Sequence, residues 1–161
     1  MSEQPISMTL TESRVEGGRA FAATYQTTSL GGGAYAPVLI CLSAGTGVTC
    51  RLTRIKYYLG TSKRVLIATG MTLSGGTGTT TAINRMLGLG QTALSTVFVP
   101  STAITAKATP AQVLDDSTPA AGEYVFDRIQ DPYILTGAKL AILISAGSGI
   151  TASATVGWDE R

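Results

Sequence analysis

The chain has 161 residues, of which 44% are hydrophobic and 14% charged; it contains no histidine, and its formal net charge is +2. The small, scattered positive charge gives no basic footprint for nucleic acid, and the lack of histidine excludes a Ser–His pair for acyl transfer. Globular proteins usually carry about 25% charged residues, so a surface this poor in charge is more typical of a protein that other subunits cover.

Residues 1–18 are predicted to form an extended N-terminal arm that ends at Gly17-Gly18. The apolar side chains of Ile6, Met8 and Leu10 alternate, so the arm would add as a strand to a neighbouring sheet and contact a partner through these three residues. The alternative is a frayed terminus. The arm has no apolar core segment, so we do not expect a secretory signal.

Strand patterns dominate from Arg19 onward, and residues 19–161 are predicted to form one domain. Aromatic and β-branched residues between glycine-rich breakers predict strands over residues 19–28, 34–42, 48–60, 63–74, 95–105 and 123–131. Two weak segments, Thr81–Leu87 and Thr109–Asp115, are expected to form helical turns. The pattern as a whole predicts an all-β sandwich or jelly roll.

The strand predicted over residues 48–60 changes its alternation near the middle. Its apolar side chains share one parity at 48, 50 and 52 and the opposite parity at 55, 57 and 59. Such a shift means that one extra residue is inserted into the strand, so we expect a β-bulge near Thr53-Arg54.

The C-terminal segment is predicted to hold two strands joined by a Gly-Ser-Gly turn, as a hairpin. Leu140, Ile142 and Ile144 alternate with their neighbours in the first strand, and residues 150–158 alternate with a Thr/Ser face in the second. The longest apolar run, LAILI at 140–144, is far shorter than the roughly 20 residues that span a bilayer, so no membrane association is expected.

The glycine-rich stretch SGGTGTTTAINRMLGLG at 74–90 invites comparison with a phosphate-binding loop. Such a loop needs a lysine and a hydroxyl residue after its last glycine, but Gly78 is followed by three threonines and the next basic residue is Arg85. We therefore interpret this stretch as a turn followed by a crossover between the sheets, without a cofactor.

The two cysteines, Cys41 and Cys50, flank a predicted turn at Gly45-Thr46. A hairpin there would place them opposite each other, as a cross-strand disulfide; the alternative, which we favour, is two small buried hydrophobic residues. Too few cysteine and histidine ligands are present for a zinc site.

The acidic residues offer a weak candidate for chemistry. Asp115 and Asp116 with loop carbonyls would form a calcium site, or else they are solvated loop acids. Neighbouring acids such as Asp159 and Glu160 would point to opposite faces of a strand and so form no catalytic pair.

The aromatic residues offer a second candidate, a surface on which a sugar would stack. Aromatic content is only 6%, so most of the rings are expected in the core. The residues concerned are Tyr57, Tyr58, Tyr124, Phe126, Tyr133 and Trp158.

Residues 34–161 resemble small virion structural proteins of tailed bacteriophages, which decorate or cement the head or form fibre bases. The resemblance rests on SAGTGVTCRLTRIKYYLG, on SGGTGTTTAINRMLG with the later ALSTVFV, on PYILTGAKLAILI and on the terminal GWDER.

The resemblance implies a non-enzymatic capsid decoration (cement) protein without catalytic residues, cofactors or metals. It implies a homotrimer that binds the major capsid protein on the capsid surface of the virion, after synthesis in the host cytoplasm. A tail or neck component, or a carbohydrate-binding adhesin, stays open as an alternative.

Overall fold

The computed structural model describes residues 19–27, 38–70, 72–74, 77–85, 91–100, 107–109, 112–127, 133–144 and 151–161. All secondary-structure elements in these residues are β-strands, which confirms the all-β class. The strands are β1 Ala20–Thr27, β2 Val38–Ser43, β3 Thr49–Leu59, β4 Val65–Thr69, β5 Thr72–Ser74, β6 Thr77–Thr80, β7 Ile83–Asn84, β8 Thr96–Pro100, β9 Lys107–Thr109, β10 Gln112–Ser117, β11 Gly122–Asp127, β12 Tyr133–Thr136, β13 Lys139–Ile144 and β14 Ala152–Glu160.

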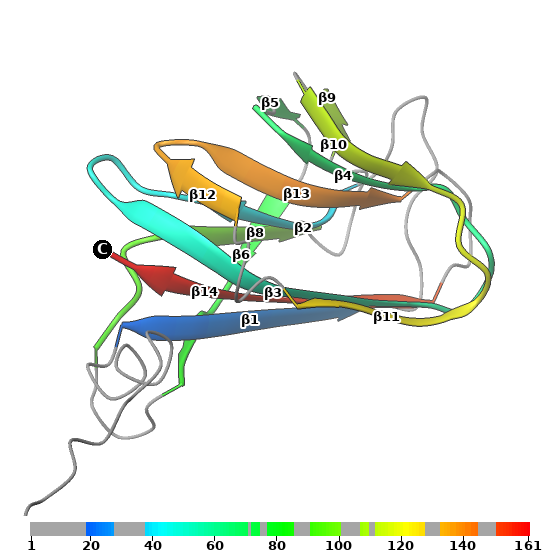
Figure 1. Ribbon diagram of the computed structural model, residues 1–161, viewed down its shortest axis with the longest axis horizontal. Coiled ribbons are helices and arrows are strands. Elements are labelled where there is room, and N and C mark those ends of the chain that lie inside the picture. Colours follow the sequence, from blue (N-terminus) through cyan, green and yellow to red (C-terminus); the bar gives the residue numbers. More distant parts are fainter. Residues whose placement is uncertain are drawn as a thin grey trace, which may run out of the picture.

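Two six-stranded antiparallel sheets pack together as a sandwich (Figure 1). The β14 sheet has the order β11-β3-β14-β1-β7, with β12 also paired to β3, and the β13 sheet has the order β10-β4-β13-β2-β8-β6. Strands β5 and β9 form a separate two-stranded ribbon. The predicted β-sandwich is confirmed, while the jelly-roll connectivity and the domain boundary stay predictions; the predicted arm at 1–18 lies outside the described residues.

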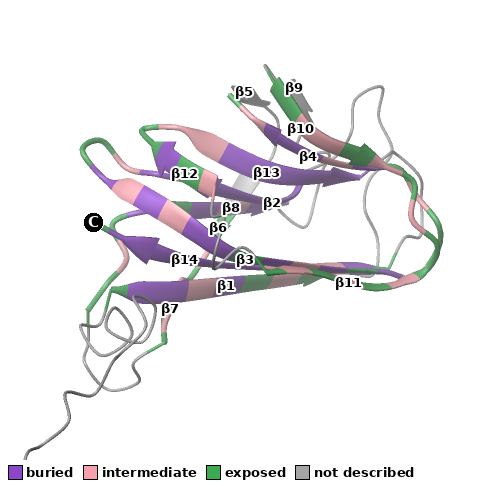
Figure 2. Ribbon diagram, viewed as in Figure 1, coloured by how far each residue is buried: buried purple, intermediate pink, exposed green. Residues whose placement is uncertain are grey.

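The core lies between the sheets and follows the predicted alternation. In β14 the side chains of Ala152, Ala154, Val156 and Trp158 are buried, whereas the hydroxyl residues between them are only partly covered. Figure 2 shows most of β14 as buried. Full burial of one large apolar side chain contributes about 1.5–3 kcal/mol, so these alternating positions account for much of the driving force for packing.

Strand β13 is buried on both of its faces. Leu140, Ile142 and Ile144 belong to the core between the sheets, while Ala141 and Leu143 belong to a second buried cluster that includes Cys41. The near-continuous apolar sequence KLAILI is therefore that of a central strand that is covered on two sides.

The predicted bulge in β3 is confirmed. Gly157 of β14 pairs with Arg54, but the next residue, Trp158, pairs with Leu52, so Thr53 is the extra residue. The Thr53 hydroxyl donates a hydrogen bond to the Gly157 carbonyl at 3.2 Å. The bulge keeps both apolar runs of β3 in the core, namely Cys50, Leu52, Ile55, Tyr57 and Leu59.

The glycine-rich stretch at 74–90 crosses the sandwich, as predicted. Residues 77–80 form β6, which pairs with β8 in the β13 sheet, and residues 83–84 form β7, which pairs with β1 in the β14 sheet. The chain thus passes from one sheet to the other between Thr80 and Ile83. The helical turn expected over Thr81–Leu87 is wrong in its described part, and Gln112–Ser117 is a strand where the second turn was expected.

The hairpin considered at Gly45-Thr46 and the hairpin predicted in the C-terminal segment are both wrong. Strand β2 belongs to the β13 sheet and β3 to the β14 sheet, so the turn at Gly45-Thr46 connects the sheets; β13 and β14 are likewise in different sheets. The alternation of apolar and polar residues indicates which side chains face the core. It does not indicate whether the next strand pairs within the same sheet or belongs to the facing sheet, because the alternation is identical in both cases.

The turn between β2 and β3 contains a glycine whose backbone conformation can be tested by substitution. Gly47 has a φ of 75°, and no atom lies within 4 Å of the place where a Cβ would be added. Changing Gly47 to Val should therefore lower the free energy of unfolding by about 1–2 kcal/mol through backbone strain alone, while Gly47→Asn should cost less because Asn tolerates this conformation. Urea denaturation of both variants checks this; equal losses would contradict it.

Candidate functional site

The C-terminal strand ends in a buried hydrogen-bond network around Glu160, a residue that is only 5% exposed. The backbone N–H of Leu94 donates to Oε2 at 2.9 Å, and that of Ser95 to Oε1 at 3.0 Å. The Ser95 hydroxyl and the Trp158 indole N–H, the latter at 3.0 Å, also donate to Oε1. Because residues 94 and 95 lead into β8 of the facing sheet, the carboxylate ties the two sheets together.

This network is structural in character, because four donors already occupy the carboxylate. Cys50 Sγ lies 2.9 Å from Ser95 Oγ at its edge. Burial raises the pKa of the Cys50 thiol to about 11, assisted by the negative charge of Glu160 and opposed by the hydrogen bond with Ser95. The thiol is therefore protonated near neutral pH and is a poor nucleophile.

Cys41 lies in the other sheet, where burial raises the pKa of its thiol to about 12. Both cysteines are free and fully buried. The disulfide alternative is therefore wrong, and the interpretation as two small buried hydrophobic residues is confirmed. The pairing fails because β2 and β3 do not pair with each other.

The remaining acidic candidates are engaged in local contacts. Asp116 accepts two hydrogen bonds from Arg64, at 2.8 and 2.5 Å, and the bond with Arg64 lowers the pKa of its carboxyl. Asp115 accepts a hydrogen bond from the Ser117 hydroxyl at 3.3 Å. Among the described residues, no group of three or more His, Cys, Asp or Glu side chains is placed to hold a metal ion.

The aromatic candidates lie mainly in the core. Tyr57 stacks on Tyr124 and Phe126 with ring centroids 5.2 and 5.9 Å apart, and Trp158 stacks on Phe21 at 5.9 Å. Of the candidate rings that the structure describes, Tyr58 is the most exposed, at 40%, and the others are buried or half-buried. The expectation that most rings are needed for packing is confirmed.

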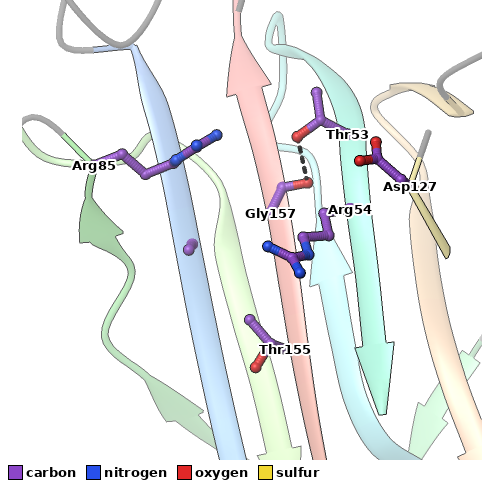
Figure 3. Close-up of a pocket in the computed structure, with 7 residues that line it drawn as sticks. Thr53, Arg54, Arg85, Asp127, Thr155 and Gly157 are labelled. Atoms are coloured by element: carbon purple, nitrogen blue, oxygen red, sulfur yellow. Dashed lines mark hydrogen bonds between the residues drawn. The ribbon is translucent and has the colours of Figure 1, made fainter. Parts of the chain in front are cut away.

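A pocket of about 180 Å³ opens on the outer face of the β14 sheet (Figure 3). Its lining comes from four strands and from the residue after β7: Ala22, Thr53, Arg54, Arg85, Asp127, Thr155 and Gly157. The pocket exists because Ala22 and Gly157 have little or no side chain. Two exposed arginines, Arg54 and Arg85, stand beside these small residues.

Several elements hold the two arginines in place. Arg54 follows the bulge residue Thr53, and the bulge aims it outward beside Gly157. Arg85 is anchored by a hydrogen bond of 2.8 Å from its backbone N–H to the carbonyl of Ala20. These two cations, separated in sequence, are therefore brought together by strands of one sheet.

The predicted contact residues Ile6, Met8 and Leu10 lie outside the described residues. Sequence reasoning missed the pocket and the Glu160 network. The signal for the pocket was Gly157, because a glycine within an otherwise regular strand often marks a place where a ligand or another backbone approaches closely. The signal for the network was Glu160, which has the same parity as the buried residues of its strand and therefore faces inward.

No family model, curated protein or solved structure matches this chain. Within the described part of the chain, no helix has the length and apolar character needed to cross a membrane.

Proposed function

We propose that the chain is a non-enzymatic structural protein that acts by adhesion, as a capsid decoration (cement) protein of a tailed bacteriophage. It would bind the major capsid protein lattice as a homotrimer and stabilise the shell. The main support for an adhesive role is that potentially reactive side chains have structural roles: the Glu160 carboxylate accepts hydrogen bonds from four donors, and both cysteine thiols are buried in the packed interior.

The surface supports the same proposal. Large apolar side chains stand exposed at separate points of the sandwich, and the chain has few charges to keep a lone subunit soluble. Contact areas of about 1,500 Å² are typical of specific interfaces, and repetition on a lattice adds avidity. In the described part of the chain, these exposed apolar residues are Tyr58, Ile83, Leu94, Val113, Val125 and Ile134.

The test combines oligomeric state with two binding assays. Light scattering during gel filtration should give a trimer, and the protein should co-sediment with expanded capsid shells while showing no hits on a glycan array. Strong glycan binding without shell binding would favour the adhesin instead. Binding to purified tails but not to heads would favour a tail or neck component.

Deletion of residues 2–16 tests the arm. We expect the sandwich to keep its β-rich circular dichroism spectrum and its unfolding transition, because the core described above is formed by later residues. Attachment to shells should weaken, since the arm would no longer pair with a neighbouring strand. Unfolding of the truncated protein would show that the segment is an integral strand.

A further inference from the structure

The pocket beside Gly157 has a lining suited to a small anion. Among the described lining residues, the charged side chains are two cations, Arg54 and Arg85, and one anion, Asp127. In the part of the chain that is described, neither guanidinium group has an ion-pair partner, whereas Lys56 on the same face pairs with Glu123 at 2.7 Å. The pocket is thus left with an excess of positive charge.

The orientation of the two arginines concentrates this charge. Figure 3 shows Arg54 extending from β3 over β14 while Arg85 extends over β1, so that both lie on the Gly157 side of the pocket and away from Asp127. A guanidinium group presents several N–H donors in a planar fork that matches the two oxygens of a carboxylate.

We propose that this pocket binds one carboxylate group, presented by an acidic side chain of a partner protein. The inference rests on the proposed function in that the partner is taken to be a protein. The lining charge of two cations and one anion suits a single negative charge better than a doubly charged phosphate. None of the lining residues that the structure describes is aromatic, so these residues offer no stacking surface for a sugar ring.

The affinity of one such pocket is expected to be low. Both arginines are exposed, so solvent and salt screen the attraction, and we expect an isolated carboxylate to bind with a Kd of about 1 mM. On a lattice that repeats the acidic side chain, many such contacts would act together.

The test is a titration of the isotope-labelled full chain, followed by nuclear magnetic resonance. The probe is the blocked peptide acetyl-Gly-Glu-Gly-amide, and the matched control is acetyl-Gly-Gln-Gly-amide. The Glu peptide should shift the backbone amide signal of Gly157 and the side-chain Nε signals of Arg54 and Arg85, while the Gln peptide should not. Equal shifts from both peptides, or none from either, would overturn the proposal.

Variants locate the site. Arg54→Gln combined with Arg85→Gln should weaken binding of the Glu peptide at least about tenfold, because each arginine supplies a charge-assisted hydrogen bond. Arg64→Gln is the matched control, because Arg64 pairs with Asp116 elsewhere and does not line the pocket. An equal loss in the control would mean that general charge, and not the pocket, attracts the peptide.

Filling the pocket gives a second test that removes no charge. A Cβ added at Gly157 would lie 3.5 Å from the Arg54 Cβ, an ordinary contact, and its φ is not in the left-handed region. Gly157→Thr should therefore fold normally, as checked by its amide spectrum, and should abolish binding of the Glu peptide. Undiminished binding to this folded variant would overturn the proposal.

Two further probes and one assay separate the possible outcomes. If inorganic phosphate or a short galacturonate oligomer binds more tightly than the Glu peptide, the proposed ligand, an acidic protein side chain, is wrong. If the Glu peptide binds but capsid shells do not, the proposed function fails and the pocket stands. If shells bind and the Glu peptide does not, the pocket assignment alone fails.

Discussion

Replacing Glu160 with alanine is expected to lower the free energy of unfolding by about 4 kcal/mol, because it leaves several buried donors without an acceptor. These donors are the backbone N–H groups of residues 94 and 95, the Ser95 hydroxyl and the Trp158 indole. Glu160→Gln should cost about half as much, since the amide oxygen keeps some of these bonds. Urea denaturation followed by tryptophan fluorescence measures both, because Trp158 is the single tryptophan.

The matched control for this prediction is Glu123→Ala. Glu123 lies on the outer face, where its side chain is 54% exposed and pairs with Lys56. An exposed ion pair contributes about 0–1 kcal/mol, so the control should lose little stability. If both variants lose the same amount, then the buried network has no special role in joining the sheets.

The two buried thiols should make the protein sensitive to alkali. Burial raises the pKa of Cys41 from 9.0 to about 12, so below pH 9 the thiol is protonated in both the folded and the unfolded chain. As the pH rises above 9, only the unfolded chain releases the proton, and stability falls by about 1.4 kcal/mol per pH unit. At about pH 10.5 the loss from Cys41 is about 2 kcal/mol, and Cys50, whose pKa is also raised, adds a loss of the same sign.

The measurement is the pH dependence of urea denaturation, made under a reducing agent for the wild type and for Cys41→Ala combined with Cys50→Ala. The double variant starts from lower stability near neutral pH, because two buried side chains become smaller. Its decline above pH 9 should nevertheless be shallower, since tyrosine and lysine titrations are common to both proteins. Parallel declines would contradict the expected role of the thiols.

The sequence predicted which side chains of each strand face the core, because side chains alternate across a pleated strand whatever its surroundings. The change of parity in β3 was enough to place the bulge near Thr53-Arg54, and the strand register then identified Thr53 as the extra residue. The alternation in β14 placed Trp158 inward and the hydroxyl residues outward. The crossover at 74–90 was also predicted, because its glycines favour a turn and no lysine follows them as a phosphate-binding loop requires, although the helical turn expected within it was wrong.

The pairing of strands was beyond this reasoning. A hairpin was considered for β2 and β3 and predicted for β13 and β14, but in each case the two strands belong to different sheets. The choice depends on which apolar faces pack best across the sandwich, and this is a property of strands distant in sequence.

By itself, therefore, the sequence determined an all-β chain, the inward and outward side of its strands, and the bulge, because these depend on a residue and its near neighbours. Only the tertiary structure decided that Glu160 meets Ser95 and that Arg54 and Arg85 stand beside Gly157. Such contacts join segments far apart in the chain, and strand order alone brings them within reach of one another.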